Sequence, residues 1–185
     1  ASDALRRVAA QGAQLAVLPE MWSTGYDYRR LAELAEQTPR VLIALQSLSL
    51  ELKLVIVGSL PEKEGSSLYN TLYVIDQGKQ VGQYRKLHLF SSMGEDRFLA
   101  AGHNSVVVPT SAGRLGLAIC YDLRFPELFR KLALEGAEIL CIPAEWPKPR
   151  QEHWRTLLRA RAIENQMLSL PPIAAAFREN WIFSA

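Results

Sequence analysis

Two pairs of strand-like segments, each joined by a short turn that contains glycine, constrain the fold of this chain most strongly. The first pair lies in residues 68–89, LYNTLYVIDQGKQVGQYRKLHL, where Gly78 can take the positive φ that a tight turn requires. The second pair lies in residues 104–120, NSVVVPTSAGRLGLAIC, with its turn at TSAGR. Because a short turn makes such segments antiparallel neighbours, the sequence predicts two β-hairpins.

Helical patterns alternate with short apolar runs in the rest of the chain. Leu5, Val8 and Ala9 recur at helical spacing, and Gly12 is placed to end that helix. Further helices are predicted within residues 29–53, where Pro39 interrupts the pattern, within 125–135, and within 149–166. Buried strands are predicted within residues 13–20, within 54–62, and after Gly136. This alternation predicts a mixed α/β domain whose helices cover the faces of its sheets.

Length and charge narrow the class of protein further. A chain of 185 residues is long enough to bury a core of its own, and its net charge of +2 gives no electrostatic reason to expect a nucleic acid or membrane partner. No apolar run reaches the roughly 20 residues that span a bilayer, and the first residues do not resemble a signal peptide. The two cysteines suggest no disulfide framework. We therefore expect a cytoplasmic protein.

Three polar residues follow strand-like runs at positions where chemistry is often found. Glu20 follows AVLP, Lys86 follows GQYR, and Cys120 follows GLAI. Each has an ordinary structural explanation: a solvated acid, a surface lysine and a small buried side chain. Together they form a chemical set, because a carboxylate can deprotonate a thiol and an ammonium can stabilise the oxyanion formed when the thiolate attacks a carbonyl.

Other catalytic sets have weaker support in the sequence. A Cys–His pair of Cys120 with His88 or His103 stays possible, although neither histidine has the local pattern that such pairs show. The spacing of the two cysteines fits no zinc motif, so no metal site is predicted. No glycine-rich phosphate-binding loop is present either.

Three motifs in order resemble the carbon–nitrogen hydrolases of the nitrilase superfamily: LAVLPEMWSTGY, YRKLHLF and GLAICYDLRFPELFR. The stretches YNTLYVID, CIPAEWP and HWRTLLRARAIENQ add to the resemblance. It implies an α/β/β/α sandwich with Glu20, Lys86 and Cys120 as the catalytic triad. Glu20 would be the general base, Lys86 and the backbone N–H of Tyr121 would stabilise the oxyanion, and Cys120 would form a thioester.

The resemblance also implies supporting residues. The family uses a second glutamate, for which Glu95 is the best candidate beside Asp96. Within the family, AEWPKPR and the helix after it are most similar to the ω-amidase branch, which acts on monoamides of short dicarboxylic acids. Trp146 and Tyr121 would line the pocket, and the candidates for binding the substrate carboxylate are Arg124, Lys148 and Arg150. Asp122, Arg124 and Glu127 are expected to fix the turn at the nucleophile through ion pairs.

The implied partners are a small amide substrate and a second copy of the chain, with no cofactor. Dimers of the family pair through helices near the nucleophile and through the C-terminal part. The resemblance covers residues 1–167, whereas residues 168–185 form an atypical tail in which Pro171 and Pro172 disfavour a strand or helix interior. Because a strand before residue 3 and the family's usual continuation after residue 167 are missing, the sandwich is expected to be incomplete at both ends. The tail is interpreted as a frameshift product, a hypothesis that the nucleotide sequence would test.

The same residues leave other functions open. A nitrilase, an N-carbamoyl amine hydrolase or an acyltransferase would use the same triad on a different substrate. A truncated, inactive homologue would act as a binding or structural module instead.

Overall fold

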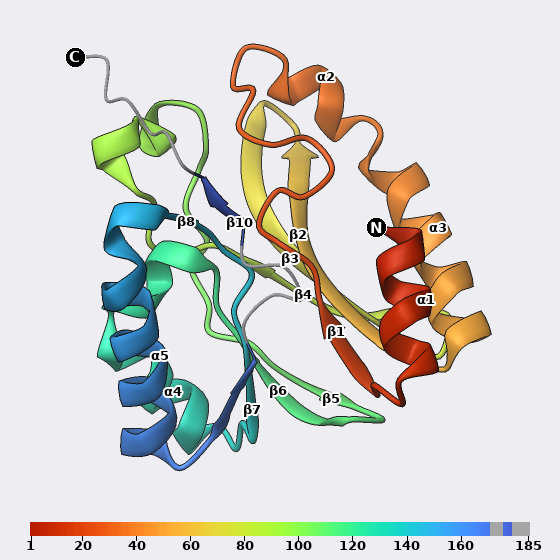
Figure 1. The fold of residues 1–185 in the computed structure, drawn as a ribbon. Helices are drawn as coiled ribbons and strands as arrows, with labels where there is room; N and C mark the ends of the chain where they lie inside the picture. The colour runs from red at the N-terminus through yellow and green to blue at the C-terminus, as the bar shows by residue number, and fades with distance from the viewer. Residues whose placement is uncertain (171–175, 179–185) are drawn as a thin grey trace.

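The computed structural model describes residues 1–170 and 176–178. Figure 1 shows two β-sheets that face each other, with one pair of helices outside each sheet. The pair on the first sheet is α1 (Ser2–Ala10) and α3 (Thr38–Leu52), and the pair on the second is α4 (Pro126–Leu134) and α5 (Gln151–Asn165). This arrangement confirms the predicted α/β/β/α sandwich.

The first sheet has the strand order β1-β2-β3-β4. Its strands are β1 (Leu15–Val17), β2 (Val55–Glu64), β3 (Ser67–Asp76) and β4 (Lys79–Arg85). β1 pairs parallel with β2, while β2, β3 and β4 are antiparallel neighbours. β1 and β4 therefore run in the same direction, and their C-terminal ends lie at the same edge of the sheet.

The second sheet has the order β5-β6-β7-β9. Its strands are β5 (Val107–Thr110), β6 (Gly113–Leu117), β7 (Ile139–Cys141) and β9 (Leu168–Leu170). β5 and β6 form the second predicted hairpin, and β6, β7 and β9 are parallel. A separate short pair joins β8 (Glu145–Pro147) to β10 (Ala176–Arg178).

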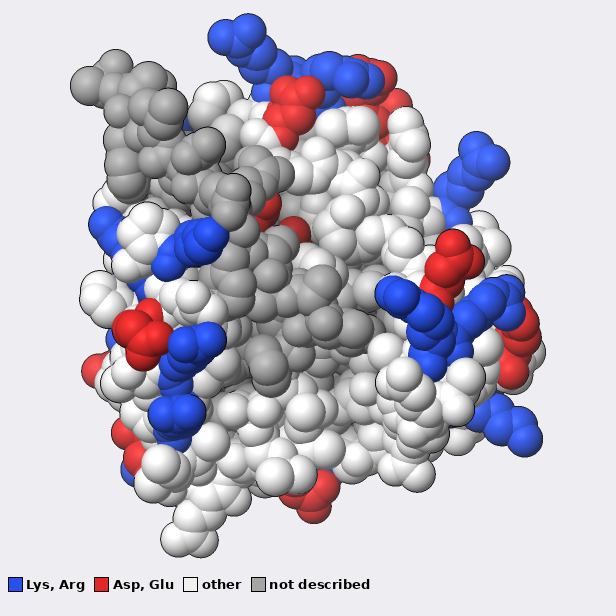
Figure 2. Space-filling model, in the orientation of Figure 1, with Lys and Arg blue, Asp and Glu red and all other residues white. Residues whose placement is uncertain are grey.

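The remaining elements are short and connect the layers. They are α2 (Leu31–Ala35) and the 3₁₀ turns η1 (Ser91–Met93), η2 (Glu95–Arg97), η3 (Cys120–Arg124) and η4 (Lys148–Arg150). No helix among the described residues is long and apolar enough to cross a membrane. Figure 2 shows positive and negative side chains interspersed on one face of the molecule, mostly toward its edges.

Alternating side chains of the first sheet separate two buried layers. Val17, Val55 and Val57 belong to the cluster between the sheets, whereas Ala16 and Ile56 pack with the apolar residues of the helices on the outer face. This pattern follows from the twofold period of a β-strand, which sends neighbouring side chains to opposite faces. β1 and the first part of β2 are thus buried on both faces, as their apolar sequences predicted, whereas most of β4 is exposed.

Several boundaries differ from those that the sequence suggested. β6 ends at Leu117, so Cys120 lies in η3 rather than at the end of a strand. Pro39 does not interrupt a helix but lies in the first turn of α3, where its missing N–H leaves no hydrogen bond unmade.

The first residues of the tail, Leu168–Leu170, join the second sheet as β9, which the sequence did not predict. Pro171 and Pro172 lie outside the described residues.

Candidate active site

Glu20, Lys86 and Cys120 come from the segments that follow three different strands. Glu20 lies in the turn after β1, and Lys86 directly follows β4, so both are at the same edge of the first sheet. Cys120 begins η3 after β6 of the facing sheet. Because the two sheets pack face to face, the three side chains meet at one end of the sandwich.

An ammonium between two carboxylates forms the centre of the site. Lys86 Nζ lies 2.9 Å from Glu20 Oε1 and 2.9 Å from each carboxylate oxygen of Glu95. The three side chains are no more than 2% exposed. The Glu95 carboxylate also accepts a hydrogen bond from the backbone N–H of Phe90. The structure thus brings Glu95, the second glutamate expected from the sequence, into contact with the predicted triad.

Two further groups orient the Glu20 carboxylate. Asn70 Nδ2 on β3 donates to Glu20 Oε1 at 2.9 Å, and the backbone N–H of Glu145 donates to Glu20 Oε2 at 3.1 Å. Both oxygens are therefore held, and a buried carboxylate with this many donors has a fixed direction.

The Cys120 thiol lies beside this charged centre. Its Sγ is 3.6 Å from the backbone carbonyl of Glu145, and the residue is 8% exposed. Its backbone has a φ of 44°, in the left-handed region that residues with a Cβ seldom adopt, and Met21 next to Glu20 has a φ of 47°. Such strained positions persist only where surrounding contacts hold them, and they are frequent at functional sites.

Burial and the neighbouring charges set the protonation of the site. Burial is the largest cause that raises the pKa of the Cys120 thiol well above its usual value, and the Glu20 carboxylate adds to it. Burial alone would lower the pKa of Lys86, but Glu20 and Glu95 outweigh it and hold that pKa well above its usual value. Burial raises the pKa of Glu95. The site therefore contains a protonated thiol and a charged ammonium, and such a thiol becomes a thiolate only if a base takes its proton.

Asp122 holds the turn that carries Cys120. Its carboxylate accepts hydrogen bonds from the backbone N–H of Ile119 at 2.8 Å and from the Tyr84 hydroxyl at 2.7 Å. It also accepts one from the backbone N–H of His88, whose Nδ1 is 2.7 Å away. Because Tyr84 and His88 flank Lys86, this fully buried side chain ties the chain around the ammonium to the chain around the thiol.

These contacts answer two expectations from the sequence. His88 pairs with Asp122, and His103 lines a different pocket, so the structure does not bring either histidine to Cys120 as a base. The turn is held by hydrogen bonds to Asp122 instead of a set of ion pairs. Arg124 faces aromatic rings, with its guanidinium carbon 5.2 Å from the ring centroid of Trp146 and 5.9 Å from that of Tyr121.

Two small cavities, which we call the acid lobe and the arginine lobe, meet at the thiol. Both are lined by Phe90, Met93, Cys120 and Glu145. The acid lobe, of about 20 Å³, is also lined by Tyr26, Tyr28, Lys86 and Glu95. The arginine lobe, of about 30 Å³, is also lined by Tyr121, Arg124, Trp146, Pro147 and Arg150. Lys148, the third cation proposed from the sequence, is not among the residues that line either lobe.

Several polar groups of the site were not predicted from the sequence. Asn70 and Glu145 orient Glu20, while Tyr26 and Tyr28 line the acid lobe. Burial is the largest cause that raises the pKa of Tyr26 well above its usual value, and Glu20 adds to it, so the Tyr26 hydroxyl stays neutral. Glu145 acts through its backbone, which no side-chain pattern reveals. Within the described residues, no group of three or more His, Cys, Asp or Glu is arranged to hold a metal ion.

The fold and the site define an α/β/β/α protein with a buried Glu–Lys–Cys cluster at the strand ends. The chain belongs to the carbon-nitrogen hydrolase family, whose model matches residues 1–180. This match confirms the resemblance inferred from the three motifs.

Among curated proteins, the chain is 43% identical over 159 residues to 2-oxoglutaramate amidase of Bacillus subtilis, covering 83% of this chain and 61% of that protein. It is 36% identical over 184 residues to the chloroplastic omega-amidase of Arabidopsis thaliana, covering 90% of this chain and 50% of that protein. The chain thus spans between half and two thirds of the length of these two relatives.

Solved structures of amidases have the same fold. An amidase of Nesterenkonia sp. AN1 from the nitrilase superfamily superposes with a TM-score of 0.84 at 30% identity, covering 92% of this chain and 69% of that one. A glutamate-to-glutamine mutant of the same amidase carries acrylamide added to its active-site cysteine.

Proposed function

We propose that the chain is a cysteine-dependent amidohydrolase in which Glu20, Lys86 and Cys120 carry the reaction. The observation that carries the proposal is the buried ion pair of Glu20 and Lys86 beside a thiol that is protonated at rest. Asn70 and the backbone of Glu145 hold the Glu20 carboxylate in one orientation. A general base must be positioned in this way to accept a proton from the thiol.

In the first half of the proposed reaction, Glu20 takes the proton of Cys120 as the sulfur attacks the amide carbonyl carbon. The carbonyl oxygen becomes an oxyanion, which the Lys86 ammonium and the backbone N–H of Tyr121 stabilise. Glu20 then gives its proton to the amide nitrogen, the carbon–nitrogen bond breaks, and ammonia leaves. The product of this half-reaction is a thioester on Cys120.

In the second half, Glu20 takes a proton from a water molecule while the water oxygen attacks the thioester carbon. The carbon–sulfur bond breaks, the carboxylic acid product leaves, and Glu20 returns its proton to the sulfur. Each proton removed by Glu20 is thus returned, and no redox step is involved. We also propose that no cofactor takes part, so that activity is expected to survive dialysis against a chelator.

The proposed substrate is the monoamide of a short dicarboxylic acid. The names of the relatives support this class, and the arginine lobe provides a cation where the free carboxylate would lie. Arg124 packs over Trp146, whose indole N–H donates to the backbone carbonyl of Arg150 at 2.8 Å. This contact joins the two arginines of the lobe through one aromatic ring, so the cation has a fixed place beside the thiol.

The test is ammonia release from matched substrates. The panel contains a dicarboxylate monoamide, a neutral amide of equal length, a nitrile and an N-carbamoyl amine. We expect the monoamide to be preferred, and Arg124→Met to remove that preference over the neutral amide. Cys120→Ala is expected to lower kcat/KM by at least about a thousandfold, while Cys141→Ala, which changes the other buried thiol, should leave it nearly unchanged.

The other outcomes assign the rival functions. Faster turnover of the nitrile or the N-carbamoyl amine would identify one of those hydrolases, and transfer of the acyl group to an added amine or alcohol would identify an acyltransferase. Activity that survives Cys120→Ala would refute the nucleophile. A folded chain that releases no ammonia from any substrate would be an inactive homologue with a binding or structural role.

A further inference from the structure

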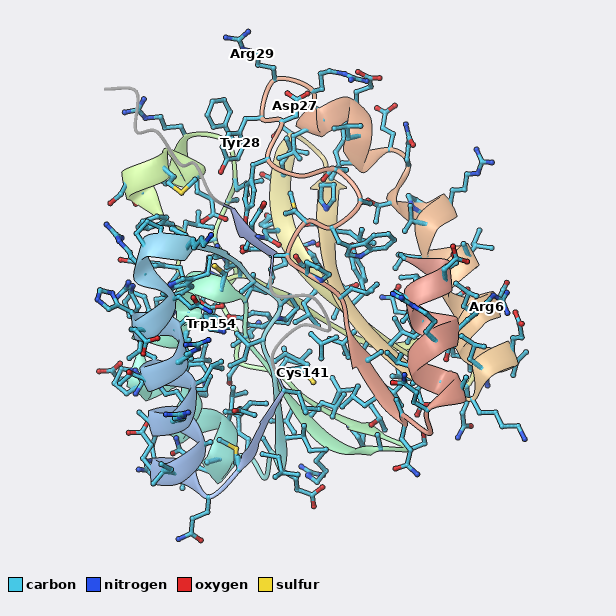
Figure 3. The ribbon with its side chains drawn as sticks, in the orientation of Figure 1. Arg6, Asp27, Tyr28, Arg29, Cys141 and Trp154 are labelled. Carbon is cyan, nitrogen blue, oxygen red and sulfur yellow. The ribbon has the colours of Figure 1, made fainter. Side chains whose placement is uncertain are left out.

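The acid lobe contains polar groups that the catalytic cycle above does not use, and the Tyr28 hydroxyl is one of them. The Tyr28 hydroxyl is buried and, among the described residues, has no hydrogen-bond partner. Its ring is fixed by Phe98 of the facing loop, with ring centroids 4.6 Å apart and planes within 7° of parallel. Figure 3 shows Tyr28 on the loop that follows β1. A buried hydroxyl without a partner costs free energy, so its persistence in a cavity suggests a ligand that the protein itself does not supply.

The other polar groups of the acid lobe are already engaged. Lys86 Nζ contacts Glu20 and both oxygens of Glu95. Glu95 also accepts from the backbone of Phe90, and the Cys120 thiol contacts the carbonyl of Glu145. The Tyr28 hydroxyl is therefore available to form a hydrogen bond with a molecule that enters the lobe.

The size of the lobe limits what that molecule is. The lobe encloses about 20 Å³, and a polar cavity needs roughly 10–15 Å³ of such space to hold one water molecule. One water or one ammonia therefore fits the acid lobe. The proposed function assigns the carbon chain of the substrate to the arginine lobe, because that lobe contains the cation for its carboxylate.

We propose that the acid lobe is the site of the hydrolytic water and that the Tyr28 hydroxyl positions this water for attack on the thioester. The inference rests on the proposed function, because it assigns a place to the water of the second half-reaction. One hydrogen of the water bonds to the Tyr28 oxygen and the other to Glu20, which accepts it as the water oxygen attacks the thioester carbon. Burial and the nearby Glu95 raise the pKa of Tyr28, so its hydroxyl stays neutral through this step.

Tyr28→Phe tests the inference, because it removes the hydroxyl and keeps the ring against Phe98. Two quantities are measured with the monoamide at saturation: kcat, and the fraction of enzyme carrying the acyl group on Cys120, by mass spectrometry after rapid quenching. Their quotient, kcat divided by the acylated fraction, is the rate constant of deacylation. We expect Tyr28→Phe to lower this constant about tenfold, which is the loss of one hydrogen bond in the transition state, and to leave kcat/KM within about twofold of wild type.

Tyr73→Phe is the matched control, since it removes the hydroxyl of another buried tyrosine, on β3, outside both lobes. It should change neither quantity. The inference is overturned if Tyr28→Phe leaves the deacylation constant unchanged, or if kcat/KM falls as much as that constant, because general damage to the site lowers both steps. A folded wild-type chain without turnover, or with its acyl group on Cys141, would instead overturn the proposed function, and this inference with it.

Discussion

At the scale of single residues, the protonation of the two cysteines follows from their different surroundings. Cys120 lies beside Glu20 and Lys86, whereas Cys141 lies on β7 with no exposed surface, in the interior that Figure 3 shows. Burial raises the pKa of both thiols, but only Cys120 has a carboxylate that adds to the effect and can remove the proton. We therefore expect a base to activate Cys120 and Cys141 to stay unreactive.

Glu20→Gln is expected to lower the pKa of Cys120 while abolishing activity. The amide removes a negative charge beside the sulfur but leaves Lys86, so the thiolate becomes easier to form although no base remains to use it. The measurement is the pH dependence of thiolate absorbance, with Cys141→Ala in both proteins so that one thiol is observed. An unchanged or higher pKa in Glu20→Gln would contradict the electrostatic account.

Cys141 is expected to make stability fall in alkaline solution. Burial raises the pKa of its thiol from 9.0 to about 12, so between these values the unfolded chain has lost a proton that the folded chain retains. The free energy of unfolding should therefore decrease with rising pH by about 1.4 kcal/mol per pH unit from this group. Urea unfolding of Cys141→Ala should show a shallower decrease than wild type from pH 9 toward pH 12. Equal slopes would contradict the prediction.

At the scale of elements, the edges of the two sheets approach each other closely where β4 passes β5. A Cβ added to Gly82 on β4 would lie 2.4 Å from a methyl carbon of Val108 on β5. The glycine is therefore required by packing between sheets rather than by its own backbone angles. No pattern within the hairpin sequence reveals this requirement for glycine. Val108, which leaves no room for a side chain at Gly82, lies 26 positions further along the chain.

Gly82→Ala is expected to lower the free energy of unfolding by about 1–3 kcal/mol, because the new methyl group must displace Val108. Val108→Ala removes the obstructing methyl groups, so the double variant should recover part of the loss. The measurement is a double-mutant cycle by urea unfolding. Strictly additive effects would show that the two side chains do not compete for the same space.

At the scale of the whole molecule, the family resemblance implies a homodimer that pairs through helices near the nucleophile. Exposed apolar side chains lie at the end of α4, on α5 and at the start of β9: Leu134 is 82% exposed, Ile163 is 76% and Leu168 is 68%. Ile163 and Leu168 line one shallow pocket beside α5, and Leu134 lies at the end of α4; both helices are at the left in Figure 1.

Ile163→Glu is expected to shift the chain toward the monomer, because a charge placed in an apolar interface is costly to bury. Ile43→Glu is the control, since Ile43 is similarly exposed, at 64%, on α3 at the opposite side of the sandwich. Light scattering over a range of protein concentrations measures the mass of each variant. Identical masses for Ile163→Glu and wild type would contradict pairing through α5.

The sequence alone predicted the class of fold, both hairpins and the three residues that the structure brings together at the candidate site. Strand alternation, turn glycines and each of the three motifs are local patterns that can be recognised in a short run of consecutive residues. The sequence also placed Glu95 near the triad, although only the fold distinguished it from Asp96 by bringing it to the Lys86 ammonium.

The groups that surround those residues depend on how the sheets pack in three dimensions. Asn70, the backbone of Glu145 and the hydroxyl of Tyr28 come from β3, from β8 and from the loop after β1, and they meet because two sheets pack face to face. The pairing of His88 with Asp122 instead of with the thiol was decided in the same way. Contacts between residues so far apart in the chain depend on how the layers pack. Packing results from many weak interactions, which produce no periodic pattern in the sequence.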